Sequence, residues 1–238
     1  MKLSITDLVR GMRDVRPATG PFILAALSAM GLYVFFEIAD EVSENEVGRF
    51  DDALLLMFRD ATDRSVPMGP EWLKETMIEI TAMGGIPLLI IIVCAVTGFL
   101  LVSRQYGPAI FTFVSILTGT VASHLLKLAY DRPRPDLVEQ FVTVHTPSFP
   151  SGHATMSAVV YLTLAVLIVR LVDRTAVRVY VVVIATLLTL AIGVSRVYLG
   201  VHWPSDVAAG WAFGAAWASL AWLTVSVLRK WRQRENAS

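Results

Sequence analysis

The sequence predicts an all-α membrane protein with six transmembrane helices. Its 238 residues are 55% hydrophobic and 17% charged, with a mean hydropathy of +0.61, whereas about a quarter of the residues in a soluble domain are charged. The apolar residues fall in runs of roughly 20, the length of helix that crosses a bilayer. Charges within these runs are confined to their ends, although a soluble helical bundle would carry charges at regular spacing along each helix.

Six apolar runs define the expected spans: Phe22–Ile38, Met77–Val102, Ala109–Leu128, Ala154–Leu171, Tyr180–Val197 and Val207–Val227. The first run follows a basic segment, residues 1–17, and lacks a small-residue cleavage site, so we expect a retained span rather than a signal peptide.

Four apolar residues of the segment 1–17 would share one helical face: Ile5, Leu8, Val9 and Met12. This favours an interfacial helix on the inner leaflet, with a disordered basic tail as the alternative.

The basic residues indicate how the spans are oriented. Twelve of them lie in the N-terminal segment, after the second and fourth spans, and in the C-terminal tail: Lys2, Arg10, Arg13, Arg16, Arg104, Arg170, Arg174, Arg178, Arg229, Lys230, Arg232 and Arg234. The loop between the first two spans, residues 39–76, instead has ten acidic residues and four basic ones. By the positive-inside rule, both termini are cytoplasmic and residues 39–76 are extracytoplasmic.

The extracytoplasmic loop contains a short amphipathic stretch, "FDDALLLMFRD". Its apolar residues Phe50, Ala53, Leu54 and Met57 share one helical face. We therefore expect a short helix at the outer membrane surface, without a direct catalytic role.

No repeat, low-complexity tract or linker divides the chain, so we expect one domain, residues 1–238. The one cysteine, Cys94, lies within the second span, which excludes an intrachain disulfide and a cysteine-based metal site. The formal net charge is zero, and nothing indicates a nucleic-acid partner. No feature predicts an oligomeric state.

Three polar motifs interrupt the apolar pattern. "KLAYDRPRP" (127–135) ends the third span, "PSGH" (150–153) opens the fourth, and "SRVYLGVHWPSD" (195–206) joins the fifth to the sixth. Ionisable residues at the edge of a hydrocarbon core are rare and usually functional. With a cytoplasmic N-terminus, the third and fifth spans run outward and the fourth and sixth inward, so all three motifs meet at the outer face.

The residue types in these motifs suit an oxyanion. Lys127, Arg134 and Arg196 supply positive charge, and the guanidinium fork matches phosphate oxygens. Ser151 is a good N-cap, and the free N–H groups around Gly152 at a helix start bind anions. No group of acidic residues has metal-ligand spacing, so we expect protein cations rather than Mg²⁺ to neutralise the ligand.

Two histidines and a carboxylate remain for catalysis. Pro204 favours a helix start, which places His202 just before the sixth span and Asp206 in its first turn. At this spacing the carboxylate can orient the imidazole and leave its other nitrogen free to attack, as in a catalytic triad. His153, from another helix, is then a candidate general acid.

Other polar residues have simpler interpretations. His124 and His145 are expected to be ordinary interface residues, and Tyr198 and Trp203 interfacial anchors. For Arg132 two roles are equally compatible with the sequence, a contact with phosphate and a structural role in the loop.

Taken together, K-x6-R-P, P-S-G-H and S-R-x5-H-x3-D resemble the signature of the type-2 phosphatidic acid phosphatase superfamily, in its membrane branch. The resemblance implies that His202 is the nucleophile and forms a phosphohistidine, that Asp206 orients it, and that His153 protonates the leaving oxygen. It also assigns five residues to phosphate binding: Lys127, Arg134, Ser151, Gly152 and Arg196. It implies no metal and no other cofactor.

The expected function is hydrolysis of a lipid phosphate or diphosphate at the outer face of the cell membrane. We favour undecaprenyl pyrophosphate; phosphatidylglycerophosphate, phosphatidic acid and lipid A-type glycolipids are alternatives, because the motifs specify the phosphate and not the tail. A vanadate haloperoxidase would have the same constellation, but six apolar runs oppose it. A non-enzymatic lipid-binding protein is opposed by the presence of His153, His202 and Asp206 together.

Overall fold

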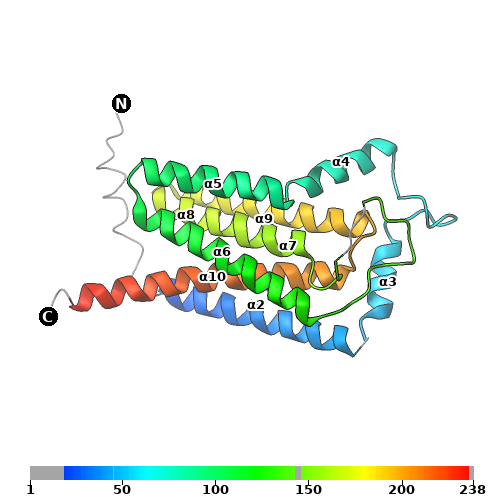
Figure 1. Cartoon of the computed structure of the whole chain (residues 1–238), viewed down its shortest axis with the longest axis horizontal. Coiled ribbons are helices and arrows are strands. Elements are labelled where there is room, and N and C mark those ends of the chain that lie inside the picture. The colour runs from blue at the N-terminus through cyan, green and yellow to red at the C-terminus, as the bar shows by residue number, and fades with distance from the viewer. Residues whose placement is uncertain (1–18, 45, 143–145, 236–238) are drawn as a thin grey trace.

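The computed structural model describes residues 19–44, 46–142 and 146–235, and these ranges form helices joined by loops (Figure 1). The elements are α2 (Thr19–Ser43), α3 (Gly48–Leu56), α4 (Glu71–Ala82), α5 (Ile86–Val102), α6 (Tyr106–Ala129), α7 (Gly152–Ser157), the π-helical turn η1 (Ala158–Leu162), α8 (Thr163–Leu171), α9 (Thr175–Tyr198) and α10 (Pro204–Glu235). The interfacial helix expected within residues 1–17 lies outside the described residues.

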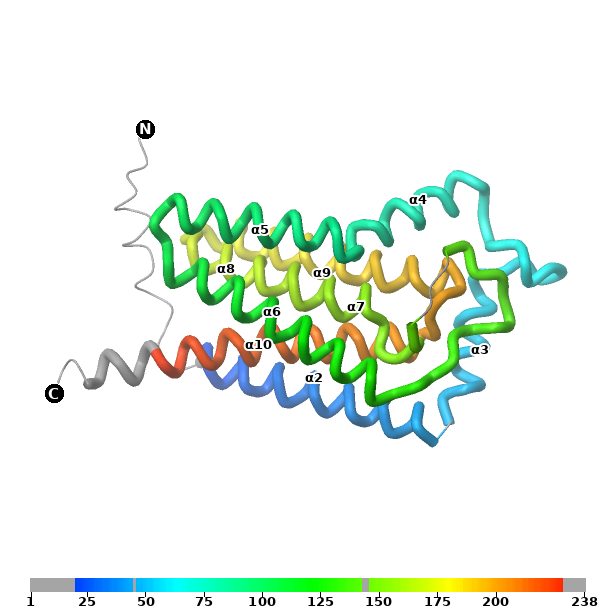
Figure 2. Tube along the Cα trace, viewed as in Figure 1, coloured from blue at the N-terminus to red at the C-terminus, as the bar shows by residue number. Residues whose placement is uncertain are grey.

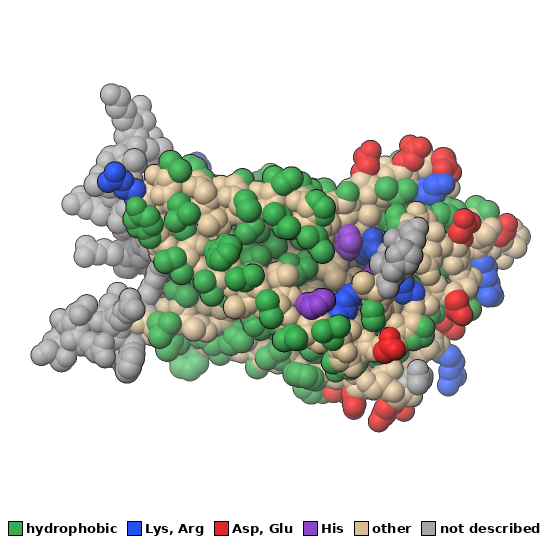
Figure 3. Space-filling model, in the orientation of Figure 1, with side chains coloured by type: hydrophobic (Ala, Val, Ile, Leu, Met, Phe, Trp, Pro, Cys, Tyr) green, Lys and Arg blue, Asp and Glu red, His purple; other side chains and the backbone are tan. Residues whose placement is uncertain are grey.

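The described helices include enough spans for the predicted membrane fold. Five are long and apolar enough to cross a bilayer: Gly20–Ser43, Tyr106–Ala129, Gly152–Leu171, Thr175–Tyr198 and Pro204–Leu228. A bent pair, α4 and α5, makes a sixth candidate span when the two helices are counted as one. Hydrophobic side chains cover the middle of the molecule, and acidic ones gather at its right-hand end (Figure 3). The all-α polytopic membrane fold is therefore confirmed.

The second span differs from the prediction. We expected one continuous helix over Met77–Val102, but the chain bends by 46° between α4 and α5. The reason is local: Gly85 is extended, with φ −72° and ψ 144°, and Pro87 falls in the first turn of α5, where its missing N–H costs nothing. As a result α5 packs against α6 whereas α4 packs against α9, and α4 diverges from the bundle (Figure 1).

The fourth span is also interrupted. Between α7 and α8 the chain forms one π-helical turn, η1, and such turns often occur at functional sites. The hydroxyl of Tyr161 in η1 donates to the carbonyl oxygen of Met83 at 2.8 Å. The irregular turn of the fourth span therefore holds the bend of the second span in place.

Small residues bring the last helix close to two others. A side chain on Gly31 of α2 would lie 2.8 Å from the carbonyl oxygen of Ala212, and one on Gly214 would lie 2.8 Å from that of Thr155. Close helix approach through small residues is the usual packing device in membranes. It seats the start of α10 against α7 and so places two of the motifs side by side.

The loop segments cover one end of this bundle. α3 lies across the right-hand end in Figures 1 and 2, where α6 and α9 end and α7 and α10 begin. α2 begins and α10 leaves the bundle at the opposite end (Figure 1). The expected short helix is present, with Phe50 and Met57 59% and 65% exposed and Asp51 and Leu55 buried on its other face.

Candidate active site

The three sequence motifs come together at the end of the bundle that α3 covers. Lys127, in the last turn of α6, donates through Nζ to the carbonyl oxygens of Pro147 (2.8 Å) and Pro150 (3.2 Å), just before α7. The backbone N–H of Ser151 donates to the carbonyl oxygen of Asp206 at 3.0 Å, which joins the starts of α7 and α10. Segments far apart in sequence therefore form one site.

His202 and Asp206 form a buried pair at the start of α10. Nδ1 of His202 lies 3.3 Å from Oδ2 of Asp206, in the spacing expected from the sequence. His202 is 1% exposed and Asp206 is fully buried. Oδ2 of Asp206 also accepts hydrogen bonds from the backbone N–H of Trp203, at 2.9 Å, and from the hydroxyl of Ser148. These donors hold the carboxylate in one orientation.

The hydrogen bonds around His202 assign its tautomer. Nη1 of Arg134 lies 3.2 Å from Nε2 of His202. Because a guanidinium has donors only, Nε2 is the acceptor, and Nδ1 carries the proton that faces Asp206. Burial lowers the pKa of His202 to about 3, while its hydrogen bond with Asp206 acts in the opposite direction. The imidazole is therefore neutral at physiological pH, with a lone pair on Nε2.

Positive charge surrounds both histidines of the motifs. Arg134 and Arg196 act electrostatically on the ring of His202. The same two residues and Lys127 act on the ring of His153 in the first turn of α7. Arg196 is only 3% exposed, and grouping buried like charges is costly unless an anion offsets them. Across the described ranges, no group of three His, Cys, Asp or Glu side chains could hold a metal ion. The cluster suits an oxyanion held by cations.

Two buried polar atoms of the cluster lack partners. The hydroxyl of Ser151 makes no hydrogen bond, and neither does Nε of Arg196. Ser151 occupies the N-cap position of α7, but its side chain does not cap the helix as we expected. A buried polar atom without a partner costs about 1–3 kcal/mol, which a bound oxyanion would recover. A side chain on Gly152 would first meet Cε of Lys127, at 4.0 Å, so the backbone here faces open space beside a cation.

His153 lies against the bend in the second span. A side chain on Gly84 would lie 3.4 Å from Cδ2 of His153 and 2.5 Å from Cγ2 of Ile192. One turn earlier in α4, Thr81 accepts a hydrogen bond through Oγ1 from Nη1 of Arg196 at 3.0 Å. The bend thus brings α4 onto both a histidine and a cation of the site.

The part of the chain that contains these motifs also matches a known protein family. Residues 108–230, slightly more than half of the chain, match the model of the PAP2 superfamily. The chain belongs to the PAP2 superfamily. The resemblance seen in the three motifs is confirmed, since all three lie within the matched residues.

Named relatives extend the match beyond this region. Phosphatidylglycerophosphatase B of Bacillus subtilis is 29% identical over 189 residues, which is 78% of this chain and 88% of the relative. Lipid A 1-phosphatase of Rhizobium etli is 35% identical over 119 residues, 46% of this chain and 47% of the relative. The crystal structure of a transmembrane PAP2 type phosphatidylglycerolphosphate phosphatase from Bacillus subtilis aligns with a TM-score of 0.67 and 25% identity, covering 83% of this chain and 93% of that one. The chain is therefore an enzyme, a multi-pass membrane phosphatase of the PAP2 superfamily.

The structure bears on the interpretations of three single residues. Arg132 is a structural residue of the PAP2 site, because its guanidinium pairs with Asp51 at 2.7 Å and Asp206 at 2.5 Å. Tyr198 is not an interfacial anchor: it is 1% exposed, and its hydroxyl donates to the carbonyl oxygen of Met68 at 3.0 Å. Trp203 is partly exposed, and its Nε1 donates to the carbonyl oxygen of Pro133 in the motif loop at 3.0 Å, so its role as an interfacial anchor stays a prediction.

The two histidines set aside earlier have different outcomes. His124 lies exposed on α6, as an ordinary interface residue would. His145 lies outside the described residues.

Sequence reasoning missed three residues that touch the site. Ser148 is fully buried and donates to Asp206, with its hydroxyl 3.4 Å from Nδ1 of His202. Thr81 comes from a segment in which no motif was visible, and Asp51 from the amphipathic stretch 50–60, for which no direct catalytic role was expected. Only Ser148 had a usable signal, since it stands two residues before "PSGH".

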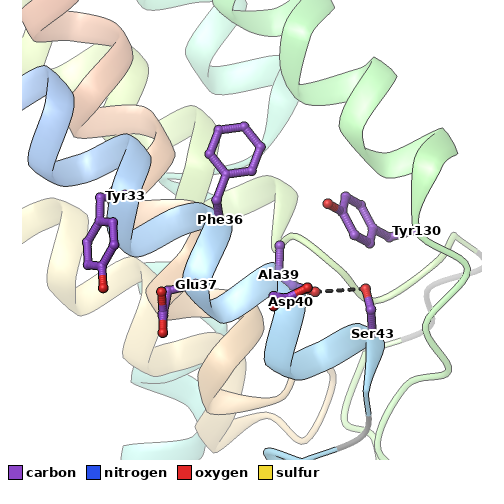
Figure 4. Close-up of a pocket in the computed structure, with 7 residues that line it drawn as sticks. All are labelled: Tyr33, Phe36, Glu37, Ala39, Asp40, Ser43 and Tyr130. Atoms are coloured by element: carbon purple, nitrogen blue, oxygen red, sulfur yellow. Dashed lines mark hydrogen bonds between the residues drawn. The ribbon is translucent and has the colours of Figure 1, made fainter.

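A separate pocket of about 390 Å³ lies on α2, near the C-cap of α6 (Figure 4). Glu37 and Asp40 of α2 line it together with aromatic residues, including Tyr130. None of its lining residues is basic, so it does not fit phosphate. The cationic cluster described above lies elsewhere, where α6 and α9 end and α7 and α10 begin.

Proposed function

We propose that this PAP2 enzyme hydrolyses a lipid phosphate at the outer face of the cell membrane, without a metal, through a phosphohistidine on His202. The observation that carries the proposal is the state of that ring. Its Nε2 accepts from Arg134 while its Nδ1 faces Asp206. A neutral imidazole with an unprotonated Nε2, set among cations that can bind the phosphate, is suited to attack a phosphorus atom.

The first step forms the phosphoenzyme. Nε2 of His202 attacks phosphorus, the bond from phosphorus to the lipid oxygen breaks, and His153 gives a proton to that oxygen. His153 holds this proton only in the complex with substrate, where the anionic phosphate offsets the cations around the ring. Arg134 moves its hydrogen bond from Nε2 to a phosphoryl oxygen. Lys127 and Arg196, the unpaired hydroxyl of Ser151 and the N–H of Gly152 hold the other oxygens.

The second step releases phosphate. His153, now neutral, takes a proton from water as the water oxygen attacks phosphorus. The bond from phosphorus to nitrogen breaks and its electron pair returns to Nε2 of His202. Asp206 accepts the hydrogen bond from Nδ1 throughout and offsets the positive charge on the ring in the phosphorylated state.

The substrate is proposed from the position of the site and from the relatives. The phosphate-binding cluster lies at the ends of spans, at the depth of lipid head groups. The relative that covers 78% of the chain is named for phosphatidylglycerophosphate, so we place that lipid first. Undecaprenyl pyrophosphate, favoured from the motifs, stays a second candidate because none of the phosphate-binding residues distinguishes a monoester from a diphosphate.

A phosphate-release panel with purified protein tests the function. It compares phosphatidylglycerophosphate, undecaprenyl pyrophosphate, phosphatidic acid and a lipid A-type substrate, each with and without excess EDTA. We expect release from at least one lipid, with activity retained in EDTA because cations of the chain neutralise the phosphate. A strict requirement for a divalent metal, or no release from any lipid, would contradict the proposal.

The matched variants in this panel are His202→Ala and His124→Ala. Loss of the nucleophile should lower kcat by several orders of magnitude. Removal of His124, an exposed histidine on α6, should change kcat by no more than about twofold, as for an ordinary surface substitution.

A further inference from the structure

Asp51 is a fully buried carboxylate in the outer segment of the chain. It lies on the inner face of α3 and is 0% exposed. Its Oδ1 accepts from the backbone N–H of Ser205 at 2.8 Å, and its Oδ2 accepts from the hydroxyl of Ser205 at 2.6 Å and from Nη2 of Arg132 at 2.7 Å. A buried charge of this kind is costly unless it is fully paired, and all of its partners belong to the site end of α10 or to the motif loop.

Arg132 links Asp51 to Asp206. Its Nη2 binds Asp51, while its Nη1 donates to Oδ1 of Asp206 at 2.5 Å and to the hydroxyl of Ser205 at 2.8 Å. The guanidinium is planar and rigid, so fixing one amino group fixes the other. Trp203 adds a third support, with its ring centroid 5.6 Å from Cζ of Arg132.

The contact with His202 is the longest hydrogen bond of Asp206. The carboxylate accepts from Arg132 at 2.5 Å and from the N–H of Trp203 at 2.9 Å, but Nδ1 of His202 lies 3.3 Å away. A small rotation of the carboxylate would therefore break the hydrogen bond with His202 before the other hydrogen bonds of Asp206. Charge acts in the same direction, because an Arg132 without Asp51 would pair with Asp206 alone and draw it from the imidazole.

We propose that Asp51 is a positioning residue of the phosphatase reaction. It acts through Arg132 and Ser205 to keep the Asp206 carboxylate oriented toward His202 and its negative charge available to the imidazole. This rests on the proposed role of His202 as nucleophile. The role of Asp51 would make α3 a support of the active site, although Asp51 contacts neither the histidines nor the phosphate-binding residues.

The test compares Asp51→Asn with Asp52→Asn in the full-length protein. The two variants remove the same charge from adjacent residues of one helix, and Asp52 lies on a less buried face. For Asp51→Asn we expect kcat to fall about 10- to 100-fold, as when a partner that orients a catalytic ligand is lost. KM, and the inhibition constant of vanadate as a phosphate probe, should stay within about threefold, because the phosphate-binding residues are untouched. Asp52→Asn should behave as the wild type.

A double-mutant cycle separates positioning through Arg132 from general support of the fold. If Asp51 acts through Arg132, Asp51→Asn/Arg132→Gln should be no slower than the slower of its two single variants. Independent structural damage would instead multiply the two losses. Arg132→Lys, which keeps the charge but cannot span two carboxylates, should lose kcat as Asp51→Asn does, and it decides the question if Asp51→Asn does not fold.

Each outcome has one meaning. Equal activity of Asp51→Asn and Asp52→Asn overturns the proposal, and so does a loss confined to vanadate affinity or to thermal stability. Absence of turnover in the wild type, measured in the same assay, would instead refute the proposed function.

Discussion

His202 is flanked by a guanidinium on one nitrogen and a carboxylate on the other, and the proposed attack on phosphorus requires an unprotonated Nε2. Arg134 contacts Nε2 at 3.2 Å and Asp206 contacts Nδ1 at 3.3 Å. Nε2, the attacking nitrogen in the proposed mechanism, therefore faces a cation, and the proton on Nδ1 faces the carboxylate. This division of the two nitrogens is the basis for the first two predictions.

Asp206→Asn should slow turnover without weakening phosphate binding. The amide can still accept from Arg132 or from the N–H of Trp203, but it cannot support the charge that develops on the ring of His202. We expect kcat to fall by about 10⁴-fold, as for the equivalent change in a serine protease triad, and the vanadate inhibition constant to change little. Weaker vanadate inhibition with normal kcat would show that Asp206 has another role.

The buried state of His202 also predicts how stability depends on pH. Burial lowers the pKa of this side chain to about 3 in the folded protein, so the unfolded chain takes up a proton near pH 6.5 that the folded chain does not. The stabilising contribution is complete above pH 6.5 and is lost as pH falls toward 3, by roughly 1 kcal/mol per pH unit. Thermal unfolding in detergent should show this fall in the wild type and a shallower one in His202→Gln. Parallel profiles would contradict the assignment.

At the scale of elements, the two interrupted spans shape the site. The bend between α4 and α5 places Thr81 against Arg196 and Gly84 against His153, and Tyr161 of η1 ties down the bend through Met83. A continuous helix over the same residues would not place α4 against α9. The irregular backbone therefore helps to position residues of the candidate active site.

Gly84→Ala should lower both stability and turnover, although Gly84 is not itself a catalytic residue. Its side chain would lie 2.5 Å from Ile192, a fully buried residue of α9, so α4 must move. We expect a loss of about 1–3 kcal/mol in stability from overpacking and a fall in kcat of about 10- to 100-fold from misplacement of catalytic groups. Gly98→Ala, on α5 where nothing lies within 4 Å, is the matched control. Equal kcat in the two variants would mean that the bend has no part in catalysis.

For the molecule as a whole, sequence predicted the spans and the catalytic motifs because both have local signals. Apolar runs report burial in lipid, and the motif residues stand close to one another in each cluster. The bend at Gly84 was also visible in principle, since two glycines and a proline fall within four residues. Asp51 had no such signal: its partner Arg132 is 81 residues away and Ser205 is 154 residues away, and only the fold brings them together.

The orientation of the whole molecule is a prediction of its own. The motif end carries many acidic side chains (Figure 3), and the basic residues in the tail and in the connections after the second and fourth spans are expected to face the cytoplasm. In a Cys94→Ser background, a cysteine at exposed Glu139 should react with a membrane-impermeant thiol reagent in intact cells, whereas one at exposed Arg174 should not. The reverse labelling pattern would place the site in the cytoplasm.

The most direct test of the central claim is to trap the phosphorylated residue. In His153→Ala with p-nitrophenyl phosphate, a leaving group that needs no protonation, attack by His202 can proceed while water attack lacks its base. After an alkaline quench, which preserves phosphohistidine, mass spectrometry of the peptides should locate phosphate on His202 and find none in His153→Ala/His202→Ala. Phosphate on a different residue would contradict the mechanism. So would release of p-nitrophenol by both His153→Ala and His153→Ala/His202→Ala with no phosphoenzyme detected in either.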